Sequence, residues 1–171
     1  PIEAMRILQN VSTHCYLLES AQANEAWGRY TFLGYDPKLE INCIDGHMKL
    51  GKLSVETDNP SEYIRQILSE YKSPKFDYLP SFTGGLVGYF SYDYLGYKEK
   101  SIRGKARDTE DFKDVDLMLF DKVIAFDNLC QKIILIANMS LDAPETGYNK
   151  AIVELKQLRE LLMHGEKKQN M

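Results

Sequence analysis

The chain has 171 residues, of which 44% are hydrophobic and 27% charged, and its 21 basic and 25 acidic side chains give a net charge of −4. A chain of this size can bury one hydrophobic core, so we expect a single domain. No basic cluster follows a helix face, which argues against nucleic acid as a partner. The apolar runs are too short to span a bilayer and the amino terminus has no signal-peptide pattern. We therefore predict no membrane partner and a cytoplasmic location.

The first half of the chain predicts a series of strands. Period-two alternation and β-branched or aromatic residues mark four of them, at residues 14–19, 30–35, 39–44 and 47–50. Asp45-Gly46 separates the last two and is a pair favoured in a tight hairpin. The first of these strands follows a start of uncertain structure and leaves Glu19 and Ser20 at its end.

Two helices are predicted from capping residues and apolar spacing. The first follows Asn59 as N-cap, with Pro60 in its first position and Glu62 in its first turn, and it ends before Pro74. The second begins near Pro144 and continues to about residue 164, where a glycine can end it.

The remaining segments predict further strands and one loop. Residues 82–94 contain Gly84-Gly85 and Gly88, which indicates a strand with unusually close neighbours. Residues 101–114 are nearly free of apolar side chains and predict a solvated loop. The apolar runs 116–126 and 131–137 predict a long hairpin. Antiparallel pairs alternating with helices favour an α+β fold, with antiparallel β-sheets packed with helices, over a parallel doubly wound sheet.

Cysteine and histidine spacing gives no sign of a disulfide framework or a metal site. Cys15, Cys43 and Cys130 lie far apart in mainly apolar contexts, which favours reduced, buried thiols. The acidic residues between Asp108 and Asp116 match no calcium loop. We predict no metal ligands and no catalytic residues in this chain, since no nucleophile stands in a recognisable elbow.

Binding chemistry is suggested at the end of the first strand. The Glu19 carboxylate could pair with an ammonium group, and the Ser20 hydroxyl could add a hydrogen bond, although a surface strand end with a local side-chain bond explains the pair as well. Aromatic residues such as Tyr30 and Phe32 could form a wall for an indole, although most aromatic residues serve a core. Arg29 is expected to be solvated or salt-bridged.

Four stretches in order resemble anthranilate synthase component I: LLESA at 17–21, WGRYTFLGYDP at 27–37, GGLVGYFSYD at 84–93, and the segment from LMLFD at 117–121 through 138. The resemblance implies the amino-terminal part of the anthranilate and aminodeoxychorismate synthase fold. It implies one amino-terminal, tryptophan-binding regulatory domain over residues 1–165, with 166–171 as a tail or interdomain linker. The catalytic chorismate-binding domain of that family has no counterpart in this sequence.

The resemblance also implies a role for particular residues. The domain would contribute half of a feedback site for L-tryptophan, formed by Leu18, Glu19, Ser20, Tyr30 and Phe32. The chorismate-binding domain of the same parent protein would complete the site and would hold Mg²⁺. That parent would convert chorismate and ammonia into anthranilate and pyruvate, with ammonia from a glutamine amidotransferase subunit. The chain alone is then expected to be inactive and to need no cofactor.

Other interpretations remain open. The corresponding domain of aminodeoxychorismate synthase component I is the nearest, although LLES followed by Ala21 favours the anthranilate enzyme. An interaction domain could dock on the amidotransferase without binding a ligand, and a stand-alone sensor would need the whole pocket within this chain. Removal of a partner domain would also leave an exposed apolar face, with self-association as a possible consequence.

Overall fold

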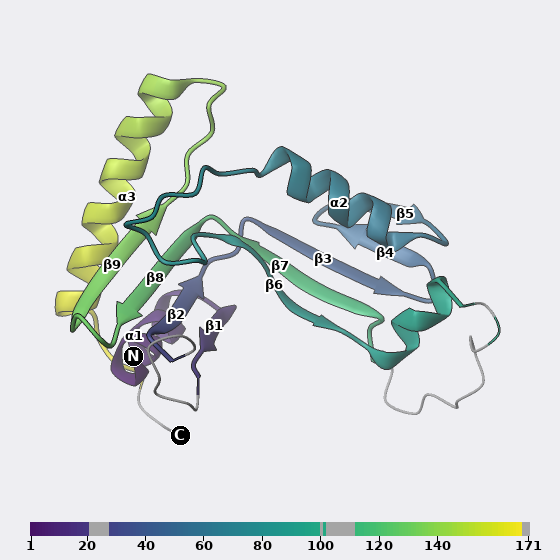
Figure 1. Cartoon of the computed structure of the whole chain (residues 1–171), viewed down its shortest axis with the longest axis horizontal. Helices are drawn as coiled ribbons and strands as arrows, with labels where there is room; N and C mark the ends of the chain where they lie inside the picture. The colour runs from purple at the N-terminus through teal and green to yellow at the C-terminus, as the bar shows by residue number, and fades with distance from the viewer. Residues whose placement is uncertain (21–27, 100, 102–111, 169–171) are drawn as a thin grey trace. The chain divides into compact units, whose positions relative to one another are not determined.

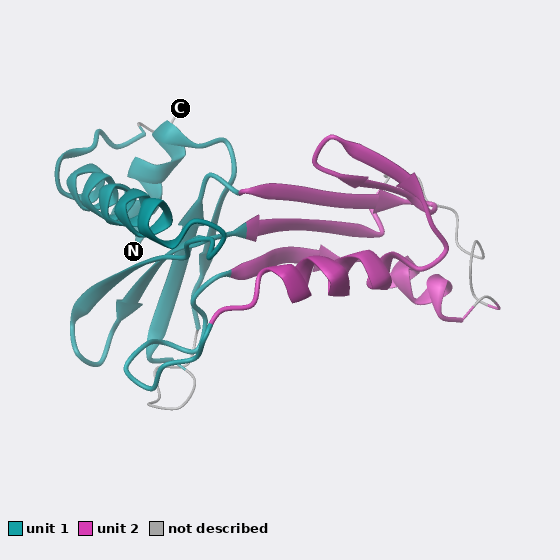
Figure 2. Ribbon diagram, turned by 90° about the horizontal axis from the view of Figure 1, so that it is seen from above, with its two compact units in different colours: residues 1–37, 74–84, 120–171 teal, residues 38–73, 85–119 magenta. Residues whose placement is uncertain are grey.

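The computed structural model describes residues 1–20, 28–99, 101 and 112–168. The chain divides into two compact units, which Figure 2 shows in separate colours. Unit 1 comprises Pro1–Pro37, Pro74–Gly84 and Phe120–Met171, and unit 2 comprises Lys38–Ser73 and Gly85–Leu119. Each unit contains one antiparallel sheet with helices, so the predicted α+β class is confirmed.

Unit 1 is a four-stranded sheet with two helices on one face (Figure 1). Its strand order is β1-β2-β8-β9. The elements are α1 (Ile2–Val11), β1 (Cys15–Leu18), β2 (Tyr30–Tyr35), β8 (Lys122–Asp127), β9 (Lys132–Ala137) and α3 (Pro144–His164). Leu8 of α1 and Leu158 of α3 pack against Leu33 and Ile124 of the sheet. Successive residues of a strand point to opposite faces of the sheet. The residues that alternate with Leu33 and Ile124 therefore form the other face, away from these two helices.

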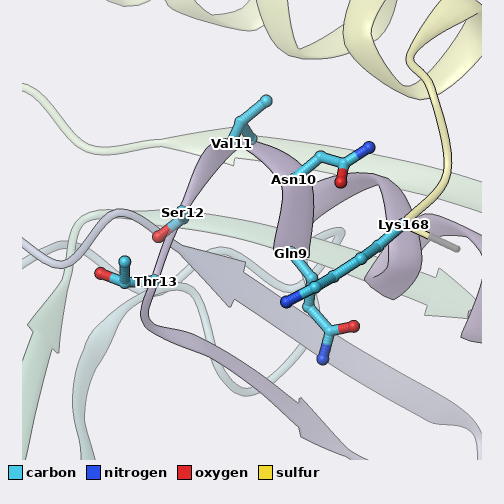
Figure 3. Close-up of a pocket in the computed structure, with 6 residues that line it drawn as sticks. All are labelled: Gln9, Asn10, Val11, Ser12, Thr13 and Lys168. Carbon is cyan, nitrogen blue, oxygen red and sulfur yellow. The ribbon is translucent and has the colours of Figure 1, made fainter. Parts of the chain in front are cut away.

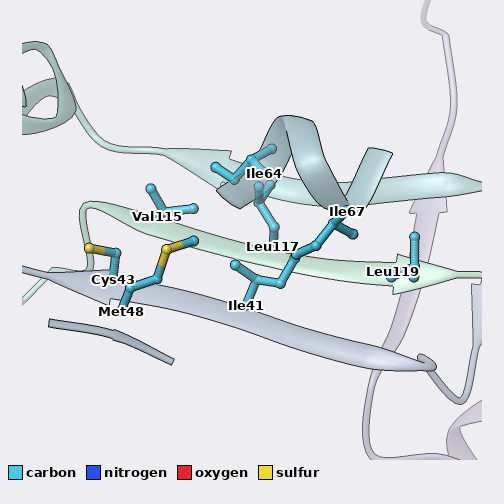
Figure 4. Close-up of a cluster of buried hydrophobic side chains, with 8 residues drawn as sticks. All are labelled: Ile41, Cys43, Met48, Ile64, Ile67, Val115, Leu117 and Leu119. Atoms are coloured by element: carbon cyan, nitrogen blue, oxygen red, sulfur yellow. The ribbon is translucent and has the colours of Figure 1, made fainter. Parts of the chain in front are cut away.

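Unit 2 is a five-stranded sheet with the order β5-β4-β3-β7-β6. Its elements are β3 (Leu39–Ile44), β4 (His47–Leu50), β5 (Leu53–Glu56), α2 (Pro60–Glu70), β6 (Gly85–Phe90), the 3-10 helix η1 (Tyr92–Tyr97) and β7 (Val115–Phe120). Figure 4 shows its core, in which Ile64 and Ile67 of α2 lie over Ile41, Met48 and Leu117 of the sheet.

Several predicted elements are confirmed with little change. The β3–β4 hairpin has Asp45 and Gly46 in its turn, both with positive φ. Helix α3 begins at Pro144 and ends at His164, as its spacing predicts. Helix α2 also begins at Pro60, but the Asn59 side chain accepts a hydrogen bond from the Ser61 hydroxyl at 2.7 Å and caps no backbone amide.

The predicted strand over residues 116–126 is wrong. Those residues form most of β7 and most of β8, and the two strands belong to different sheets with a break at Asp121. The sequence gives little sign of this break, because Phe120 and Val123 are both buried (3% and 0% exposed) and only Asp121 and Lys122 interrupt the apolar residues. The β8–β9 hairpin itself is confirmed.

Four further differences concern local structure. Helix α1 occupies the start that the sequence left open, and β5 extends the β3–β4 hairpin by one more strand. The predicted strand over 82–94 is shorter, because η1 follows β6. Cys43 is buried, but Cys130 is exposed, so its predicted burial is wrong. Most of the predicted loop at 101–114 lies outside the described residues.

Gly88 of β6, one of the three glycines that the sequence singled out, has a clear packing role. Gly88 has a φ of 151°, and a Cβ atom at this position would collide with the backbone carbonyl of Asp116 in β7. The predicted close approach of the backbone is therefore confirmed here. Within the described part of the chain, no helix is both long and apolar enough to cross a membrane, and no group of three or more His, Cys, Asp or Glu side chains is placed to hold a metal ion.

Candidate functional site

The five residues predicted to bind an effector lie on β1 and β2, two neighbouring strands of unit 1, or directly after β1. Leu18 ends β1, and it pairs directly with Phe32 of β2. Tyr30 lies two residues before Phe32, so it shares the same face of the sheet. Glu19 and Ser20 follow β1 immediately and are exposed, as is Leu18 at 45%. Their predicted place at a strand end is thus confirmed.

The shared face is the one opposite α1 and α3. Leu17 and Leu33, the neighbours of Leu18 and Phe32 along their strands, pack into the helix-covered core. Leu18, Tyr30 and Phe32 therefore point away from that core. An apolar and aromatic surface thus lies next to the strand end that leads into Glu19 and Ser20.

This surface continues into a cluster of aromatic rings. The Tyr30 and Phe32 ring centroids are 5.8 Å apart, and Phe82 packs edge-on against Phe32 at 5.6 Å. Tyr16 contacts Phe82 at 6.4 Å and Phe120 at 4.8 Å. Such edge-to-face contacts stabilise aromatic clusters beyond the burial of their area. Phe32 thus contacts two other rings of the cluster.

Tyr16 and Phe82 are members of this cluster that the sequence reasoning missed. Strand alternation could have found Tyr16, because it lies two residues before Leu18. Its ring lies against Gly34, the residue that pairs with it across β2, and a Cβ atom at Gly34 would collide with that ring. Burial raises the pKa of the Tyr16 phenol. No hydrogen-bond partner for its hydroxyl is found among the described residues.

The aromatic residues between positions 89 and 94 lie in unit 2. Tyr89, Phe90, Tyr92 and Tyr94 belong to β6 and η1 of unit 2, where the ring of Tyr94 packs against Phe90 at 4.7 Å. Trp27 lies outside the described residues.

Arg29, the residue before β2, is salt-bridged, which is one of the two alternatives that the sequence predicts. Its Nε and Nη2 atoms donate to the two carboxylate oxygens of Asp127 at 3.1 and 2.7 Å. The Asp127 side chain is completely buried (0% exposed), and it also accepts a hydrogen bond from the Cys130 amide at 3.0 Å. The Arg29 hydrogen bonds, with the smaller help of the Cys130 amide, hold the pKa of Asp127 well below its usual range. The hydrogen bond to Asp127 in turn raises the pKa of the Arg29 guanidinium.

A separate hollow of about 410 Å³ lies at the carboxyl end of α1 (Figure 3). It is lined by Gln9, Asn10, Val11, Ser12, Thr13 and Lys168. None of the five predicted effector residues lines it, so it is not the pocket that the sequence leads us to expect.

The site on β1 and β2 therefore combines three chemical features. A carboxylate can pair with a cation, a hydroxyl can hydrogen-bond a polar group, and an aromatic and apolar surface can take up a flat ring. This combination suits an aromatic amino acid. Arg29, a cationic side chain that lies over the Tyr30 ring, is already paired with Asp127.

Comparison with known proteins gives a consistent result, although no protein-family model matches the chain. Anthranilate synthase component 1 of Pseudomonas aeruginosa is 36% identical over 155 residues, which cover 86% of this chain and 31% of that protein. The Acetivibrio thermocellus protein of the same name is 32% identical over 157 residues, covering 88% of this chain and 32% of its own length.

A solved structure shows the same relationship. The structure of anthranilate synthase component I from Streptococcus pneumoniae TIGR4 matches with a TM-score of 0.61 and 26% identity, over 84% of this chain and 31% of that one. The chain thus spans about a third of the length of the curated relatives named above. The matched part is the amino-terminal region of those relatives. On sequence and fold together, the chain belongs to the anthranilate synthase component I family.

Proposed function

We propose that the chain is the amino-terminal regulatory part of an anthranilate synthase component I and provides half of a feedback site for L-tryptophan. The observation that carries this proposal is the placement of Leu18, Tyr30 and Phe32 on one face of the sheet. Glu19 and Ser20 follow directly at the end of the same strand. Family membership supports the proposal independently.

The chemistry of the half-site matches the chemistry of tryptophan. The Glu19 carboxylate would pair with the ammonium group of the amino acid, and the Ser20 hydroxyl would donate a hydrogen bond to its carboxylate. The indole would lie against Leu18 and the aromatic wall, because its large apolar surface gains most from such contacts. Glu19, Ser20 and Leu18 are all exposed, so a second surface is needed to enclose the ligand.

That second surface would come from the chorismate-binding domain of the same enzyme. In the complete protein, chorismate and ammonia would yield anthranilate, pyruvate and water, with ammonia supplied by a glutamine amidotransferase subunit. Mg²⁺ and the catalytic groups would belong to the chorismate-binding domain, and this chain alone would be inactive. Tryptophan would inhibit by binding one arrangement of the two domains better than the other.

The two rival interpretations receive less support. The relatives described above are anthranilate synthases, which favours that enzyme over aminodeoxychorismate synthase. A docking domain that binds no ligand has no chemical need for a carboxylate at a strand end next to a half-buried aromatic surface.

Calorimetric titration with L-tryptophan tests the proposal. Two samples are needed: the 171-residue chain, and a polypeptide that joins it to a chorismate-binding domain. We expect Ser20→Ala to weaken tryptophan binding to the joined protein by about tenfold or more, the usual cost of a lost hydrogen bond to a charged group. L-phenylalanine serves as the specificity control, because it lacks the indole N–H and the larger ring.

The two samples separate the alternatives. Binding by the short chain would show that this half of the site is preformed, whereas binding only by the joined protein would show that both halves are required. The proposal fails if the folded joined protein does not bind tryptophan, or if Ser20→Ala binds it as tightly as the unsubstituted protein does.

A further inference from the structure

We propose that Arg29 and Asp127 are a positioning pair that fixes the ring of Tyr30 in the aromatic wall and thereby sets the affinity of the tryptophan half-site. The ligand part of this inference rests on the function proposed above. The positioning part rests only on contacts within unit 1.

Two hydrogen bonds to the Asp127 carboxylate restrict the Arg29 guanidinium. Two hydrogen bonds, at 3.1 and 2.7 Å, join the guanidinium to both oxygens of one carboxylate. A two-point contact of this kind fixes the plane of the guanidinium as well as its position. The carboxylate cannot move aside, because it is completely buried and is also held by the Cys130 amide.

The fixed guanidinium lies over the ring of Tyr30. The Arg29 Cζ atom is 4.9 Å from the ring centroid, a distance at which a cation is attracted to the face of an aromatic ring. Tyr30 is also the residue paired with Asp127 across β2 and β8. Arg29 thus covers one face of the Tyr30 ring. The centroid of that ring is 5.8 Å from the centroid of the Phe32 ring.

Backbone contacts support the same arrangement. The turn after β8 holds the start of β2, because the Asn128 amide donates to the Arg29 carbonyl at 2.8 Å. The Asn128 side chain donates to the Thr31 hydroxyl at 3.3 Å. Residues on both sides of Tyr30 are therefore fastened to the turn that contains Asp127.

An ion pair with a buried carboxylate is not a strong source of stability by itself. The cost of removing a carboxylate from water offsets much of the attraction to its partner. The Arg29–Asp127 pair lies against the proposed ligand surface, so it contributes more by orienting the Tyr30 ring than by stabilising the fold. The consequence is that a small change in the pair should alter ligand affinity before it alters the fold.

Two conservative substitutions and one matched control test the inference. Arg29→Lys keeps the positive charge but loses the planar fork, and Asp127→Asn keeps the shape but loses the negative charge. Asp36→Asn is the control, because Lys122 pairs with Asp36 at 2.9 Å and lies 5.3 Å from the ring of Tyr35 near the other end of β2. The control therefore removes an ion pair and disturbs a cation–ring contact away from Tyr30.

Two measurements are made on each variant. The first is the set of nuclear Overhauser contacts between the Tyr30 and Phe32 rings in the ligand-free 171-residue chain. The second is the affinity for L-tryptophan of the joined protein described above. We expect Arg29→Lys and Asp127→Asn to weaken the ring contacts and to lower the affinity about tenfold, and Asp36→Asn to change neither.

Each contrary result has one meaning. Unchanged ring contacts in both Arg29→Lys and Asp127→Asn overturn the positioning role. Altered contacts with unchanged tryptophan affinity overturn the link to the ligand. Failure of the unsubstituted joined protein to bind tryptophan overturns the proposed function, and the ligand part of the inference with it, whereas the ring contacts still decide the positioning role.

Discussion

The carboxylate of Asp127 is held in its charged form by its surroundings. It accepts hydrogen bonds from Arg29 and from the Cys130 amide, and these bonds lower its pKa. The folded chain therefore binds a proton at Asp127 less readily than the unfolded chain does. The resulting stabilisation is complete above the pKa of an unfolded aspartate, about 4, and is lost as the pH falls towards the lower pKa of the folded state.

This linkage predicts a difference between wild type and Asp127→Asn at acid pH. We expect the wild-type free energy of unfolding to fall more steeply between about pH 5 and pH 2, because only the wild type must protonate this carboxylate. Urea denaturation at a series of pH values measures both slopes. Asp36→Asn should follow the wild-type slope, since its ion pair with Lys122 leaves the Asp36 side chain 67% exposed. Parallel curves for wild type and Asp127→Asn would contradict the linkage.

In unit 2, one tyrosine fastens the 3-10 helix to two other elements. The Tyr97 hydroxyl donates to Asp114 at 2.6 Å and accepts from the Gly46 amide at 2.7 Å. Asp114 also accepts from the Asp45 amide at 2.9 Å. Burial, followed by the Asp114 contact, raises the pKa of Tyr97. Helix η1, the β3–β4 turn and the residue before β7 thus meet at a single hydroxyl.

Loss of that hydroxyl should destabilise unit 2. We expect Tyr97→Phe to lower the free energy of unfolding by about 1–3 kcal/mol, because the Asp114 carboxylate and the Gly46 amide each lose a partner in a sheltered place. Tyr92→Phe is the matched control from the same helix, and at 82% exposure it should change stability by less than about 0.5 kcal/mol. Chemical denaturation compares the two variants. Equal stabilities would show that the Tyr97 hydroxyl does not join these elements.

At this scale, sequence reasoning succeeded where the signal was local. The β3–β4 hairpin depends on Asp45-Gly46, and α3 depends on Pro144 and its apolar spacing, all within the segment itself. It failed at Asp121, because an apolar run does not show that two strands leave for different sheets.

In the candidate site too, the sequence predicts the local features but not the contacts between distant segments. Strand alternation places Tyr30 and Phe32 on one face, and the motif places Glu19 and Ser20 at a strand end. The partner of Arg29 lies 98 residues further along the chain, so no local pattern could identify it. Phe82 likewise reaches the cluster from another segment of unit 1.

For the whole molecule, the main feature is that each unit has its own core. Met48 and Leu117 lie in the core of unit 2, and Leu33 and Leu158 lie in that of unit 1. The sequence predicts one domain over residues 1–165, and that remains a prediction. Two separate cores raise the question of whether the chain opens as one cooperative unit or as two.

Hydrogen exchange on two cavity variants answers this question. Met48 and Leu158 are 0% and 2% exposed, so replacing either one with alanine should cost about 2–5 kcal/mol through lost burial and the cavity left behind. We expect Met48→Ala to speed amide exchange in β3, β4 and β7 of unit 2 while β2 and β8 of unit 1 exchange at wild-type rates. Leu158→Ala should give the opposite pattern, and each variant is thereby the control for the other. Faster exchange in both units from either substitution would instead support a single cooperative domain, because a core lost anywhere would then weaken every strand.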